Sequence, residues 1–192
     1  ELSDNGTGKF SDIDNASLEY IKWLGCSHVW YTGVIRHSTQ ASEAGCTASH
    51  PQFVKGKAGS PYAICDYYDV NAYLADNAGD RMLEFEQLIK RTHDAGLKVI
   101  IDFVPNHVAR DYGKVDMTPG HPVLGAEDDR SVHWREENDF IYYPGEALRL
   151  PTESPKGMEP YYEMPAMATG NNCYTPAPGI NDWFETVKIN YC

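Results

Sequence analysis

The chain has 192 residues, of which 42% are hydrophobic and 23% charged, a composition typical of a globular protein with a sizeable core. A formal net charge of -12 without any cluster of lysine and arginine argues against nucleic-acid binding. No apolar run is long enough to span a bilayer. The five cysteines include no Cys-x-x-Cys pair, so neither a zinc knuckle nor a redox motif is indicated.

The first predicted unit is a helix followed by a strand. Residues 14–24, DNASLEYIKWL, carry apolar side chains at every third position, which predicts one buried helical face. Asp14 or Asn15 can cap the start of this helix, and Gly25 follows as a stop. Residues 27–35 are rich in β-branched and aromatic side chains and therefore predict a strand.

A second unit repeats this order further along the chain. Residues 77–95 predict a helix that stops at Gly96, and residues 98–104 predict a strand that is apolar on both faces. Alternation of helix and strand favours an α/β fold with a parallel sheet. The polar segment 36–70 between the units is long for a compact domain, which indicates a functional loop.

After the second strand the periodicity is lost. Residues 108–182 are rich in proline, glycine, tyrosine and acidic residues, and we interpret them as an irregular insertion with a few short strands. Short strands are expected within FIYYPGEALRLP and NDWFETVKINY.

Three polar side chains gather at the end of the second strand. Asp102 lies within the predicted strand, and Asn106 and His107 follow Pro105. A neutral imidazole can exchange hydrogen bonds near pH 7, and an asparagine carbonyl suits a hard cation. The alternative is that Asp102 and Asn106 satisfy loop backbone groups while His107 is a tolerated surface residue. Spacing alone does not separate the two interpretations.

The stretch DFVPNH at 102–107, preceded by AGLKVII, resembles the first conserved region of the α-amylase family, the family 13 glycoside hydrolases. GKFSDIDNASLEYIKWLGCSHVWYTGVIRHS resembles the first helix and second barrel strand of that family. SPYAICDYYDVN is similar to its Gly-Tyr…Asp-Tyr segment, although Pro61 stands where glycine is usual. GINDWFETVKINY is similar to the end of domain B in bacterial members, so the order matches throughout.

The resemblance implies part of a (β/α)8 TIM barrel, about strands 2 and 3 with helices 1 and 2, carrying an irregular β-rich insertion called domain B. We expect residues 1–107 to be the N-terminal part of the catalytic barrel and 108–182 to be domain B. Residues 183–192 would return towards barrel strand 4.

The resemblance also implies roles for four residues. Tyr62 and His107 would bind the sugar at the cleavage point, and Asp102 would support the floor of the active site. Asn106 would ligate a structural calcium ion between the barrel and domain B. The implied partner is an α-1,4-glucan or oligosaccharide, and the remainder of the barrel would be required beside it.

The family's catalytic carboxylates have no matching positions here, because they lie on barrel strands 4, 5 and 7. The full protein would be a retaining enzyme, with nucleophile and acid/base about 5 Å apart. We therefore expect the 192-residue chain alone to be inactive and marginally stable. Localisation does not follow from the sequence; a polymeric substrate would favour an extracellular or periplasmic place.

Two other interpretations stay open. The first is a non-catalytic relative with an amylase-like fold, either carbohydrate-binding or transporter-associated, in which the carboxylates are missing. The second is a standalone α/β module that binds a metal through Asp102, Asn106 and His107.

Overall fold

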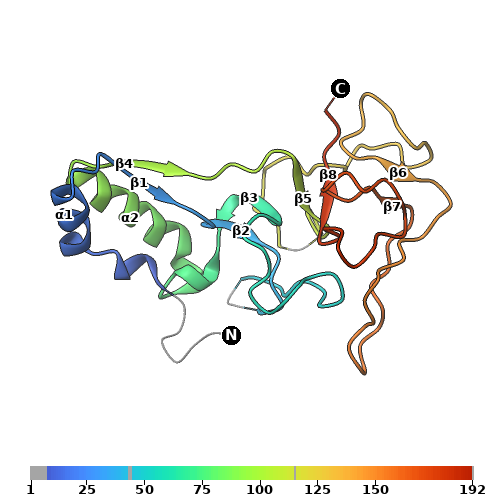
Figure 1. Ribbon diagram of the computed structural model, residues 1–192, viewed down its shortest axis with the longest axis horizontal. Helices are drawn as coiled ribbons and strands as arrows, with labels where there is room; N and C mark the ends of the chain where they lie inside the picture. Colours follow the sequence, from blue (N-terminus) through green and yellow to red (C-terminus); the bar gives the residue numbers. More distant parts are fainter. Residues whose placement is uncertain (1–7, 43–44, 115, 192) are drawn as a thin grey trace.

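The computed structural model describes residues 8–42, 45–114 and 116–191. The molecule is elongated, with the helices and a parallel strand pair at one end and short antiparallel pairs at the other (Figure 1). No helix in these described ranges is long and apolar enough to cross a membrane.

The helical end contains the two predicted helix–strand units. Helix α1 (Asn15–Trp23) precedes strand β1 (His28–Tyr31), and helix α2 (Arg81–Asp94) precedes strand β4 (Lys98–Ile101). β1 and β4 pair in parallel, with His28 opposite Lys98 and Tyr31 opposite Ile101. The parallel pairing confirms the predicted α/β arrangement. Three single-turn helices complete this end, at Phe10–Asp12 (η1), Ala72–Leu74 (η2) and Ala78–Asp80 (η3).

Helix α1 begins as the sequence predicts. The carboxylate of Asp14 accepts hydrogen bonds from the Ser17 backbone N–H and hydroxyl, both at 2.8 Å, and so caps the helix. Its one fully buried side chain, Leu18, packs with Ala95 and Leu97 behind β4. A larger core includes side chains of both β1 and α2. Its buried members are Phe10, Tyr31, Val34, Val70, Ala75, Phe85 and Leu88.

The segment expected to be a loop between the two units contains a strand at its end. Its end forms strand β3 (Ile64–Val70), which pairs antiparallel with β2 (Ile35–His37). The prediction missed β3 because two of its buried side chains are aspartates. Asp69 accepts from Arg81 Nε at 2.8 Å, and Asp66 accepts from the Thr118 hydroxyl at 2.6 Å, so partners distant in sequence make their burial tolerable.

The two predicted strands are also shorter than expected. The strand predicted over 27–35 is interrupted at Gly33, whose φ of +68° is incompatible with a β conformation, and the chain resumes as β2. The strand predicted over 98–104 ends at Ile101. Beyond it, the hydroxyls of Tyr67 and Tyr191 donate to the carbonyls of Val104 and Pro105, where ladder hydrogen bonds would otherwise run.

The other end has a separate core. Strand β5 (His107–Ala109) pairs antiparallel with β8 (Thr186–Lys188), and β6 (Tyr142–Tyr143) pairs antiparallel with β7 (Ala166–Met167). The strands expected within 140–151 and 181–191 are therefore present as β6 and β8. The predicted domain boundary between 107 and 108 falls inside β5, and the division into three segments stays a prediction.

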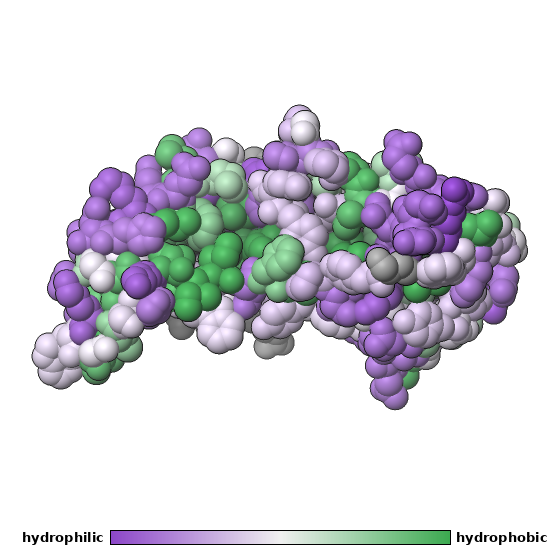
Figure 2. All heavy atoms as spheres, turned by 90° about the horizontal axis from the view of Figure 1, so that it is seen from above, coloured by the Kyte–Doolittle hydropathy of each residue, from purple (hydrophilic) through white to green (hydrophobic). Residues whose placement is uncertain are grey.

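Several apolar side chains on and beside the parallel pair are open to solvent. Figure 2 shows an apolar stretch over the half of the molecule that holds β1 and β4. Trp30, Ile100, Ile101 and Phe103 are all among the exposed large hydrophobic residues. A two-stranded parallel sheet is unusual, because parallel sheets are normally extended on their edges and covered on both faces.

Candidate substrate-binding site

The candidate site lies on residues 102–107, which connect β4 to β5. This segment leaves the carboxyl end of a parallel strand, the edge at which α/β folds place their ligands. The Tyr67 hydroxyl also donates to the His107 carbonyl at 3.4 Å, so one tyrosine contacts both ends of the connection. The segment is thereby held at several points although it has no regular secondary structure.

Asp102 sits at the start of this connection. Its Oδ1 accepts a 2.8 Å hydrogen bond from the indole N–H of Trp30, on the neighbouring strand. Its Oδ2 is shielded from water and has no hydrogen-bond partner among the described residues. A buried carboxylate oxygen without a partner is costly, so Asp102 can still accept a donor from a further element or a ligand.

His107 is buried and both ring nitrogens are engaged. Asn106 Nδ2 lies 3.0 Å from its Nδ1, and the Tyr62 carbonyl lies 3.2 Å from its Nε2. Because the amide donates and the carbonyl accepts, these contacts assign the neutral tautomer with the proton on Nε2. Burial lowers the pKa of His107, and the nearby Lys188 charge lowers it further, so the ring is neutral at pH 7.

Tyr62 reaches His107 through its backbone. Its carbonyl accepts from the imidazole, while its side chain remains 43% exposed. The structure therefore brings together the two predicted sugar-binding residues. The contact it shows is structural, since His107 anchors the loop that presents the Tyr62 ring.

Asn106 is held by three neighbours. Its Oδ1 accepts from the Lys188 ammonium group, and its Nδ2 donates to the Gly170 carbonyl at 3.0 Å as well as to His107. The Lys188 ammonium group occupies the position beside Asn106 Oδ1 where a calcium ion would bind. These residues therefore do not fit a calcium ion. In the described part of the chain, no group of three or more His, Cys, Asp or Glu side chains could hold a metal. The expected calcium ion therefore stays a prediction.

Two residues beside His107 were not found from the sequence. The Trp183 ring packs edge-on against the imidazole at 4.5 Å between centroids, and its N–H donates to Glu185 at 3.0 Å. Gly170 packs so closely that an added Cβ would lie 2.7 Å from His107 Cβ. Both are far from His107 in sequence. Trp183 lies within GINDWFETVKINY, whose similarity to the end of domain B gave it no role, and no motif marks Gly170.

Comparison with known proteins identifies the family. Residues 3–158 match the family described as "Alpha amylase, catalytic domain". The chain is 26% identical over 133 residues to a Beta/alpha-amylase of Paenibacillus polymyxa, covering 69% of this chain and 9% of that protein. It is 26% identical over 130 residues to the 1,4-alpha-glucan branching enzyme GlgB 2 of Clostridium perfringens strain SM101, covering 68% and 16%. It is 40% identical over 105 residues to the Amino acid transporter heavy chain SLC3A1 of Rattus norvegicus, covering 55% and 12%.

A solved alpha-amylase from Lactobacillus plantarum superposes with a TM-score of 0.41 and 31% identity, over 54% of this chain and 20% of that one. The fold and the family match define an α/β protein that carries part of a (β/α)8 barrel. The chain belongs to the alpha-amylase catalytic-domain family, whose members among its relatives include glycoside hydrolases and glucan-branching enzymes. It spans between 9% and 16% of the length of the first relatives it matches.

Proposed function

We propose that this chain is the front part of a retaining α-amylase-type enzyme that acts on α-1,4-glucans such as starch or maltooligosaccharides. The observation that carries the proposal is that Tyr62 and His107 meet beside the DFVPNH segment, in a chain that belongs to this family. The relatives named as an amylase and a 1,4-alpha-glucan branching enzyme support the substrate class.

The chemistry assigned to this chain is binding and orientation. The exposed Tyr62 ring offers a flat apolar face, on which the C–H face of a sugar can pack. His107, kept neutral by burial, holds the carbonyl of that same residue and therefore fixes the position of the ring. Asp102 retains an acceptor oxygen at the base of the segment.

Bond cleavage requires a nucleophile and an acid/base carboxyl group about 5 Å apart. We place both outside this chain, on the barrel strands that the family resemblance implies. The 192-residue chain alone is accordingly proposed to be inactive, with the remainder of the barrel as its necessary partner.

Steady-state hydrolysis of maltoheptaose by the full-length protein tests the proposal. Tyr62→Ala should lower kcat/KM at least tenfold, because the sugar loses its stacking face. Tyr20→Ala removes another exposed tyrosine, on α1, and serves as the control. Unchanged kinetics in Tyr62→Ala would remove Tyr62 from the substrate site.

A second function is favoured by one specific observation, the 40% identity to the rat Amino acid transporter heavy chain. On that interpretation the chain is part of a non-catalytic, transporter-associated protein with an amylase-like fold. The two functions differ in the strands beyond this chain. Catalytic carboxylates on barrel strands 4 and 5, together with glucan turnover, support the enzyme; their absence supports the transporter-associated protein.

A further inference from the structure

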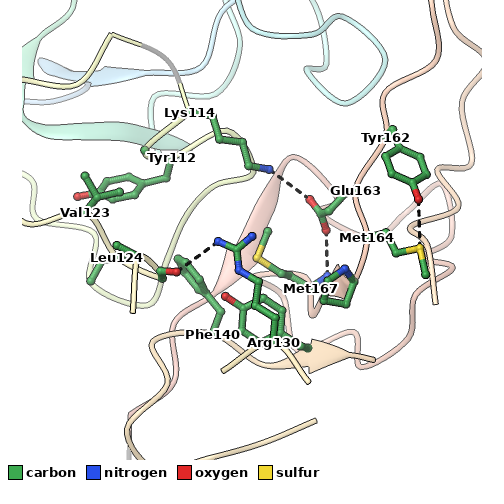
Figure 3. A pocket seen from close by; sticks show the side chains of 15 residues that line it. Tyr112, Lys114, Val123, Leu124, Arg130, Phe140, Tyr162, Glu163, Met164 and Met167 are labelled. Carbon is green, nitrogen blue, oxygen red and sulfur yellow. Dashed lines mark hydrogen bonds and ion pairs between the residues drawn. The ribbon is translucent and has the colours of Figure 1, made fainter. Parts of the chain in front are cut away.

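A cavity of about 420 Å³ lies in the predicted domain B (Figure 3). It opens between residues 112–130 and 162–167, and its walls include Phe140 and Tyr142. Tyr62, Asp102, Asn106 and His107 are not among the residues that line it. Its size is within the range of small-molecule sites.

Two glycines allow the walls of this cavity to pack. Gly113 and Gly125 both line it, and both have positive φ, at +72° and +78°. A Cβ on Gly113 would lie 2.2 Å from Val123 Cγ1, and one on Gly125 would lie 2.6 Å from Phe140 Cε2. The shape of the cavity is therefore fixed by backbone conformation and close packing.

The buried acid in the cavity is already satisfied. Glu163 pairs with Arg110 at 2.6 Å and accepts from the Met167 N–H at 2.9 Å. Its other oxygen accepts from the Tyr161 hydroxyl at 3.0 Å. The same oxygen lies 3.8 Å from the Lys114 ammonium (Figure 3). Glu163 is thus a structural anion and not a free ligand for a cation.

The two exposed cations of the cavity retain unused donors. Among the described residues, Lys114 donates one hydrogen bond, to the Tyr161 hydroxyl at 2.9 Å, and an ammonium group has three donors. Arg130 donates to the Gly125 carbonyl at 3.3 Å and lies over the Tyr142 ring, and a guanidinium has five donors. A ligand that fits here presents several hydrogen-bond acceptors.

The side chains at the rim of the cavity and the charges around it indicate which class of ligand it can bind. Tyr162 is 72% exposed and Met164 is 50% exposed at the rim, which gives an apolar surface for a flat ligand. The local charges are balanced, since the three cations Lys114, Arg110 and Arg130 are matched by Glu163, Asp111 and Asp128. A chain of net charge -12 also repels anions at long range. The ligand that fits this cavity is rich in hydrogen-bond acceptors, partly apolar and uncharged. A neutral saccharide has all three properties.

A second cavity of about 530 Å³ adjoins the first through Lys114. It is lined by Tyr161 and by Asp111, a buried carboxylate whose Oδ1 accepts from the Ser38 hydroxyl at 2.5 Å. Its Oδ2 has no hydrogen-bond partner among the described residues. Two cavities that share one donor fit a ligand longer than a single ring. We propose that they form a second saccharide-binding site, in which Lys114 and Arg130 donate to hydroxyl oxygens of a neutral oligosaccharide and Tyr162 packs on its ring.

The test measures maltotriose binding to the full-length His107→Ala variant by titration calorimetry, so that the first site is weakened. Only the choice of an α-glucan probe rests on the proposed function. In this background, Arg130→Ala and Tyr162→Ala are each compared with the parent. Arg149→Ala and Tyr174→Ala are the matched controls, since both residues are exposed and neither lines either of these two cavities.

We expect maltotriose to bind the His107→Ala parent, and Arg130→Ala to raise Kd about tenfold, as loss of a hydrogen bond from a charged group does. Tyr162→Ala should weaken binding as well, and the two controls should bind like the parent. No binding to the parent, or equal binding by all variants, overturns the second site. If glucose 6-phosphate binds more tightly than maltotriose, the assignment of this site to a neutral sugar is overturned. Hydrolysis is measured separately, so failure of the proposed enzyme activity is distinguishable from failure of this site.

Discussion

The buried ion pair between Arg110 and Glu163 gives the sharpest stability prediction. The Arg110 side chain is 0% exposed and that of Glu163 is 4% exposed, with 2.6 Å between Nη1 and Oε1. Arg110 also donates to the Phe184 carbonyl at 2.7 Å and the Thr186 carbonyl at 3.1 Å, so it connects β5 to the chain around β8. Glu163→Ala would leave a buried guanidinium without a counter-charge, which costs about 3–5 kcal/mol.

That cost is a large fraction of a typical total stability of roughly 5–15 kcal/mol. Equilibrium urea unfolding of the domain that contains this chain measures it. Asp94→Ala is the control, because Asp94 pairs with Lys90 at the surface, where side chains 63% and 73% exposed interact weakly. Replacing the pair by Arg110→Met with Glu163→Leu should recover part of the loss, since no charge remains buried. A cost in Glu163→Ala as small as in the control would refute the reasoning.

Three further predictions concern His107 and the chain as a whole. Gly170→Ala should destabilise by about 1–3 kcal/mol, because the new methyl group would overlap Thr186 and His107; a thermal melt unchanged from wild type would contradict the packing. The lowered pKa of His107 means that the unfolded chain binds its proton more readily; the associated stability is complete above about pH 6.5 and is lost as the pH falls through the lower folded value. Urea midpoints at pH 7.5 and 5.0 should therefore differ less in His107→Gln than in wild type, and an equal difference would exclude this role. The isolated 192-residue chain should release no reducing sugar from maltoheptaose, and measurable turnover would show that the catalytic groups lie within it.

Local patterns were sufficient for the helical end of the fold. Asp14 caps α1, and the apolar stripe of residues 77–95 corresponds to α2, because capping and helical burial depend on neighbours within a few positions. The parallel pairing of β1 with β4 followed from the alternation of helices and strands.

Contacts between residues far apart in the sequence could not be predicted from such local patterns. Strand β3 carries buried Asp66 and Asp69, whose partners Thr118 and Arg81 come from other elements. Sequence patterns predict that such aspartates lie in loops, because their burial depends on partners that only the tertiary structure provides.

The candidate site shows the same limit. The motif at 102–107 identified Asp102, Asn106 and His107; the structure brings Asn106 and His107 together with Tyr62, whereas Asp102 contacts Trp30. The motif did not indicate the Lys188 ammonium group at the Asn106 carbonyl oxygen, which argues against calcium there. β5 and β8 become neighbours only through antiparallel pairing across the whole insertion.

The most direct test of the central claim is the stereochemistry of glucan cleavage by the full-length protein. Proton NMR can follow the anomeric signals during the first minutes of maltoheptaose hydrolysis, before mutarotation equilibrates them. We expect the α-anomer to appear first, as retention through two carboxyl groups requires, and we expect Tyr62→Ala to slow its release. Initial release of the β-anomer, or no turnover by a folded full-length protein, would contradict the account.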